Sequence, residues 1–101
     1  MNTMYQPTED EVIQDIIEYS PIHDQYYIEG LGTKITIKYD NDLGASLLLF
    51  DSGKKELAVI RFTDSEIQTH PELKIPGVEM AIMKDATSDQ IKTALEHIKA
   101  S

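Results

Sequence analysis

The sequence predicts a single α+β domain over residues 1–101, an antiparallel sheet of about five strands with N- and C-terminal helices packed on it. Near each end of the chain, a capping signal precedes apolar residues at helical spacing. The middle contains short apolar or alternating runs separated by turn residues, which is typical of antiparallel strands. Helices segregated from strands in this way indicate an α+β protein, and 101 residues fit one domain.

The first helix is predicted over residues 9–19. Thr8 and Glu11 have the spacing of a capping box, and the acidic residues of the first turn face the positive end of the helix dipole. Pro21 ends the pattern. The apolar positions that recur at helical spacing are Val12, Ile13, Ile16 and Ile17.

Five strands and a closing helix follow. The strands are predicted over residues 25–29, 34–39, 45–50, 57–62 and 78–83, with turns at 30–32, 40–44 and 51–55. Residues 47–50 and 59–60 are apolar on both faces, so the third and fourth strands should be central or covered. The segment 63–77 is predicted as a loop with a short helical turn near 65–69. Thr87 and Gln90 form a second capping box. The apolar positions of the closing helix are Ile91, Ala94, Leu95 and Ile98.

Composition narrows the class of protein. The chain has no cysteine, so disulfides and thiolate metal sites are excluded. The longest apolar run is four residues, 47–50, far below a membrane span, and the N-terminus lacks the basic and apolar regions of a signal peptide. We therefore expect a cytoplasmic protein that does not bind a membrane. A net charge of −9 also argues against direct binding of nucleic acid, because phosphate would repel it.

Residue patterns that support catalysis are absent from the sequence. His23, His70 and His97 do not have metal-ligand spacing and are expected to be surface or turn residues. No serine has a G-x-S-x-G setting, and Ser88 is assigned to helix capping. The glycines of residues 30–34 lack phosphate-loop spacing, and residues 40–42 lack the rest of an EF-hand loop. We expect no catalytic residue, no cofactor and no metal, and a small enzyme is the third of three functional hypotheses.

The charge is unevenly distributed along the chain. Residues 1–33 contain seven acids and no Lys or Arg, whereas residues 34–101 contain eleven acids and nine bases, so the first third carries −7 of the −9. Helical geometry places three acids at i, i+4 and i+7, opposite the apolar residues. We call this set the acidic ridge: Glu11, Asp15 and Glu18. Like charges at this spacing destabilise a helix by a few tenths of a kcal/mol each.

The leading hypothesis is a non-enzymatic binding protein, an inhibitor or regulator whose acidic surface docks on a basic partner such as a nucleic-acid-binding protein. Carboxylates one helical turn apart have a spacing similar to that of phosphates, as in a nucleic-acid mimic. In size and charge, and in no motif, the chain resembles small acidic nuclease inhibitors of phages and mobile elements, including anti-CRISPR and anti-restriction proteins. Besides the acidic ridge, the predicted partner-binding residues are Asp24, Tyr26, Tyr27 and Glu29. Adjacent strand residues point to opposite faces, so the helices can bury only one of the two tyrosines.

Two alternatives remain. The acidity can serve solubility alone, in an accessory or structural subunit. The chain can also form a homodimer, because residues 47–50 with Ala58, Ile60 and Phe62 supply more apolar strand surface than one face can hide. In a monomer, segment 63–77 would instead have to cover the second face.

Overall fold

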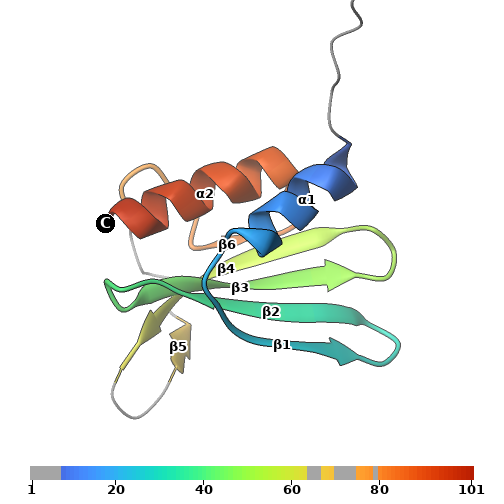
Figure 1. Ribbon diagram of the computed structural model, residues 1–101, viewed down its shortest axis with the longest axis horizontal. Helices are drawn as coiled ribbons and strands as arrows, with labels where there is room; N and C mark the ends of the chain where they lie inside the picture. The colour runs from blue at the N-terminus through green and yellow to red at the C-terminus, as the bar shows by residue number, and fades with distance from the viewer. Residues whose placement is uncertain (1–7, 64–66, 70–74, 79) are drawn as a thin grey trace, which may run out of the picture.

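In the part of the chain that the computed structural model describes (residues 8–63, 67–69, 75–78 and 80–101), two helices flank six strands, an α+β fold as predicted (Figure 1). The capping boxes at Thr8 and Thr87 are both formed, and each helix begins at the next residue. The elements are α1 (Glu9–Glu18), β1 (Ile22–Ile28), β2 (Gly32–Lys38), β3 (Leu43–Phe50), β4 (Lys55–Phe62), β5 (Ile67–Thr69), β6 (Ile82–Met83) and α2 (Ser88–Ala100).

The sheet is antiparallel, in the order β1-β2-β3-β4-β5, and β6 also pairs with β4. Because β3 occupies one edge of β4, the other edge is shared: β6 pairs with its first half and β5 with its last three residues. Six strands therefore fill five positions. This confirms the predicted sheet and the central position of the third and fourth strands.

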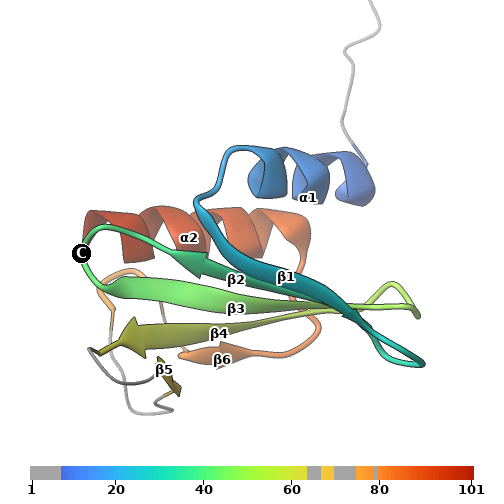
Figure 2. The same ribbon diagram turned by 60° about the horizontal axis from the view of Figure 1, so that its bottom comes forward.

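Both helices lie on the same face of the sheet (Figures 1 and 2). Strand register brings Ile35, Leu47 and Leu57 into one row on that face, and all three are buried. The neighbouring row contains Ile37, Ala45 and Val59. The core between the sheet and the helices also includes Ile13, Ile16, Ile91, Ala94, Leu95 and Ile98. Neither described helix lies on the opposite face, which we call the helix-free face.

Two predictions for segment 63–83 need correction. Residues 67–69 form strand β5 and not a helical turn, because they pair with the free edge of β4; residues 65 and 66 of that prediction lie outside the described residues. The predicted strand over 78–83 is reduced to Ile82–Met83. Before it, Val78 forms a bridge back to Ile75 across a turn in which Gly77 has a φ of 87°. Val78 is engaged in this bridge. Among the described residues that follow, contact with β4 begins at Ala81, whose carbonyl accepts from the Val59 N–H, and continues through Ile82 and Met83.

The two helices are joined where they begin. Ser88 is only 1% exposed, its backbone N–H donates to the Glu9 carboxylate at 2.8 Å, and its hydroxyl donates to the Glu9 carbonyl at 2.8 Å. Lys55 Nζ approaches the same carboxylate at 3.3 Å. The assignment of Ser88 to capping was therefore wrong: Thr87 is the cap, and Ser88 connects α2 to α1.

Replacing Ser88 by Ala should destabilise the fold by about 1–2 kcal/mol, the usual effect of removing a buried hydrogen bond. For a domain of this size, that corresponds to a fall in Tm of roughly 4–15 °C. Thermal unfolding followed by circular dichroism measures it. The exposed Thr93 of α2 is the matched control: T93A should leave Tm unchanged or raise it slightly, because Ala is the better helix former. Equal Tm values for S88A and the unmodified protein would show that the contact does not contribute.

Candidate functional site

The acidic ridge occupies the solvent side of α1. Glu11, Asp15 and Glu18 are exposed, and α1 turns Ile13 and Ile16 into the core on its other side. Glu11 is partly engaged, because its carboxylate accepts from the Thr8 backbone and hydroxyl as half of the capping box. No Lys or Arg lies within α1.

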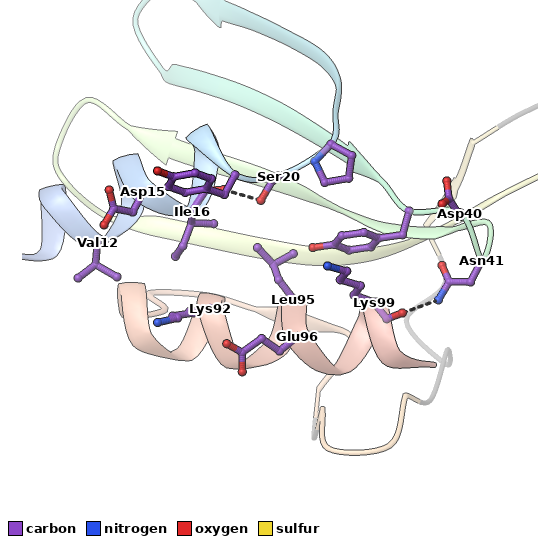
Figure 3. Close-up of a pocket in the computed structure, with 13 residues that line it drawn as sticks. Val12, Asp15, Ile16, Ser20, Asp40, Asn41, Lys92, Leu95, Glu96 and Lys99 are labelled. Carbon is purple, nitrogen blue, oxygen red and sulfur yellow. Dashed lines mark hydrogen bonds between the residues drawn. The ribbon is translucent and has the colours of Figure 1, made fainter.

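A groove of about 790 Å³ runs beside this ridge, between α1 and α2 (Figure 3). Ile16 and Leu95 point toward one another across it. Its apolar lining is Val12, Ile16, Pro21, Tyr39 and Leu95. Its charged lining is Asp15 from α1, Asp40 from the β2–β3 turn, and Lys92, Glu96 and Lys99 from α2.

The inner end of the groove combines an aromatic ring with a fixed turn. Burial raises the pKa of Tyr39, and hydrogen bonding to Ser20 opposes this in part, so the phenol is neutral at pH 7. The Ser20 hydroxyl also donates to the Ile16 carbonyl at the end of α1. In the β2–β3 turn, the Asn41 amide donates to the carbonyls of Ile98 (2.9 Å) and Ser101 (2.8 Å), which ties that turn to the end of α2. The groove can therefore hold an apolar group with polar contacts at its rim.

Glu9 belongs to the scaffold and not to the acidic surface. Its carboxylate accepts from the Ser88 backbone and lies beside Lys55, and these contacts hold its pKa below the ordinary value for Glu. Of the acids on α1, Asp10, Asp15 and Glu18 form no hydrogen bond or ion pair with a described side chain, and of these Asp15 and Glu18 belong to the acidic ridge.

The other predicted partner-binding residues do not join the acidic ridge in one surface. Asp24 and Tyr26 pair with residues of β2 that point to the helix-free face, while Tyr27 points to the helix side. Tyr27 donates to Asp51 at 2.8 Å, which raises its pKa. Glu29 is exposed at the end of β1. Neither tyrosine is buried, with 45% and 59% of the side chains exposed, because β1 is the edge strand.

The sequence places Tyr19 next to the acidic helix, but the predicted partner-binding residues did not include it. Tyr19 follows α1, is 82% exposed and lines the groove. Its spacing offered a signal, since it stands four residues after Asp15 and seven after Val12 and so continues their side of the helix. The α2 side of the groove, from Lys92 to Lys99, gave no such signal in the sequence, because α2 meets α1 only through a tertiary contact.

Neither described histidine lines the groove. His23 makes an edge-on contact with Phe62 on the helix-free face, with ring centroids 5.4 Å apart. His97 is exposed on α2, as predicted, and His70 lies outside the described residues. Within the described ranges, no three His, Asp or Glu side chains are grouped in a way that could hold a metal ion.

Comparison with protein-family models, curated proteins and solved structures finds no match. Neither described helix is long and apolar enough to cross a membrane.

The lowered pKa of Glu9 predicts a pH-dependent contribution to stability. That contribution is present above the pKa of the unfolded chain, near 4.5, and is lost as the pH falls through the lower folded value. The Tm difference between the unmodified protein and E9Q should therefore be largest near neutral pH and narrow below about 4.5. E18Q removes one charge without touching this contact and controls for net charge. A difference for E9Q that stays constant with pH would contradict the prediction.

Proposed function

We propose that the chain is a non-enzymatic protein-binding module, an inhibitor or regulator that holds a basic segment of a partner protein against the acidic ridge and the adjoining groove. The observation that carries the proposal is the grouping of three features on one side of the molecule. These are an α1 face without a base, the exposed Tyr19, and a groove with an apolar lining.

Electrostatics favour a basic partner. Three like charges along one helix face oppose helix stability, and a Lys at any of these positions would relieve the repulsion. In return for this loss of helix stability, the acidic ridge attracts positively charged surfaces. That attraction raises the rate of association with a basic partner and disfavours acidic partners. At −9 the whole chain adds to this attraction at low salt.

The groove supports a contact beyond charge. Anchors that dominate binding energy are usually aromatic or apolar side chains, or the stem of an Arg, enclosed in a pocket and surrounded by polar contacts. Tyr39 and Leu95 supply such an apolar enclosure, and Asp15 and Glu96 on opposite banks can pair with a base beside the anchor. On the α2 side of the groove, Lys92 and Lys99 would repel a basic group of the partner. Such a group can therefore pair only with Asp15 on the α1 side or with Glu96, which lies between the two lysines.

The length of the acidic ridge limits the size of the matching surface. From Glu11 to Glu18 the helix rises about 10 Å. One nucleic-acid strand advances roughly 3.4 Å per phosphate, so the ridge could replace about three consecutive phosphates. Mimicry of nucleic acid would therefore be local, directed at a short basic patch such as a few Lys and Arg in a binding cleft.

The test compares two double variants that change the net charge equally, by +4. D15K/E18K reverses two acids of the acidic ridge but leaves Glu11 to cap α1, whereas D24K/E29K reverses Asp24 of β1 and Glu29, which follows β1. Each tagged protein is used to capture proteins from its native source, and captured proteins are identified by mass spectrometry. We expect the unmodified chain and D24K/E29K to retain a basic protein that D15K/E18K loses, with capture falling as salt rises.

Both variants should fold, because the altered side chains are exposed. Circular dichroism checks this. Equal loss by the two variants would attribute capture to net charge alone. Unchanged capture by D15K/E18K would mean that the acidic ridge is a solvated face, and the proposal would fail.

A further inference from the structure

We infer that the helix-free face of the sheet binds the same face of a second copy of this chain, in a weak symmetric dimer. This surface lies on the opposite side of the sheet from the acidic ridge and the groove, so the inference does not depend on the proposed function.

The helix-free face is unusually apolar for one that no helix covers. In an antiparallel sheet with helices on one face, the residues that point to the other face are normally polar. Here β3 contributes Leu48 and Phe50, and register aligns Leu48 with Tyr26 through β2. The partly exposed apolar side chains on this face are Ile28, Leu48, Phe50, Ala58 and Ile82, with Tyr26 at 45% exposure.

The face is also electrically neutral. Register places two bases and two acids of the described strands on it, so their formal charge is 2 − 2 = 0 although the chain carries −9: Lys34, Lys38, Asp24 and Glu56. At the edge of the face, Lys54 next to Phe50 forms an ion pair with Asp85 at 3.9 Å. A second acidic copy can approach this side without the repulsion that the α1 side would produce. A partner that is itself basic gains nothing here, which favours a copy of the same chain.

The charges are arranged symmetrically about the centre of the patch. Lys34 on β2 and Glu56 on β4 both align with Leu48 on β3, one on each side, about 10 Å apart. Neither forms an ion pair with another described residue. Suppose that the two sheets stack face to face, related by a twofold axis that runs between them parallel to β3. Strand β2 of each copy then faces β4 of the other, so Lys34 of each copy faces Glu56 of the other copy. This gives two Lys34–Glu56 pairs, and Leu48 of one copy faces Leu48 of the other.

At one end of the helix-free face, side chains of the same chain pack on one another, which reduces the area available to a second copy. Phe62 extends over Gly44, where a Cβ would lie 2.9 Å from its ring, and its ring contacts His23 and Lys38. Phe62 and Ile60 are only 9% and 2% exposed, although register turns them away from the helices, so neither adds to the exposed apolar surface of this face.

The remaining patch measures roughly 20 by 17 Å from strand spacing and rise, so a dimer would bury on the order of 800 Å² in total. That is below the size of a stable interface, and it predicts dissociation in the micromolar range or above.

The test is a charge exchange measured by sedimentation velocity at roughly 5–500 µM, the range suited to such an interface. The unmodified chain should rise from one chain mass, 11.4 kDa, toward two as concentration increases. K34E and E56K each place like charges opposite one another and should weaken dimerisation by at least about tenfold. The double variant K34E/E56K restores the pairing and should return to within about threefold of the unmodified chain.

The design separates this pairing from net charge. K34E lowers the net charge and E56K raises it, yet both should dissociate the dimer, and the double variant has the original charge. R61E matches the change in K34E on the other side of the sheet, where register places the exposed Arg61, and should have no effect. A single-chain mass across the whole range would overturn the inference, as would a dimer that tolerates both single variants or one that the double variant does not restore. A monomer that instead uses this face to capture another protein would overturn it too.

Discussion

The contact between Glu9 and Ser88 sets the arrangement of the helix layer, and the candidate site depends on that arrangement. The two residues are the first of α1 and of α2, so the helices meet where both begin. The Glu9 carboxylate also lies at the positive end of the α2 dipole, where a negative charge is favourable. At the other end of the layer, Asn41 ties the β2–β3 turn to the last carbonyls of α2. The groove lies between these two fixed points, so its banks are positioned before any ligand binds.

The same arrangement explains why the sheet has two unlike faces. The two described helices, of ten and thirteen residues, both lie on one side, so neither of them covers the other face. The chain closes one end of that face locally: Phe62 fills the space that Gly44 leaves, and the aromatic ring replaces the missing side chain. Leu48 and Phe50 are beyond its reach and stay partly exposed. Apolar positions on both faces of the central strands therefore have two separate causes, helix packing on one side and incomplete local cover on the other.

Sequence patterns predicted the elements whose signals are local. Both capping boxes placed a helix start correctly, and the alternation at Lys34 and its neighbours gave β2 within two residues at its start. The short strand β5 carries no periodicity, because three residues cannot show one, and it is defined by the exposed edge of β4. For the site, helical spacing correctly placed the acidic ridge on the outer side of α1. The groove could not be found this way, since Tyr39 and Leu95 meet only through tertiary packing. Strand alternation did imply that Tyr26 and Tyr27 separate, which the structure confirms.

The separation of charge connects the two proposed surfaces. The acids of α1 lie on the helix side of the sheet, and the neutral patch around Leu48 lies on the other, so most of the −9 is kept away from the surface where two copies would meet. A dimer formed there would carry its two acidic ridges on opposite outer sides. Each ridge would remain free for a basic partner, and neither interaction would require the other. One partner molecule with a single basic patch would gain no avidity from such a dimer, because both ridges cannot reach it together. Dimerisation would benefit only a partner that presents basic sites on two separated copies, such as a symmetric oligomer or a filament.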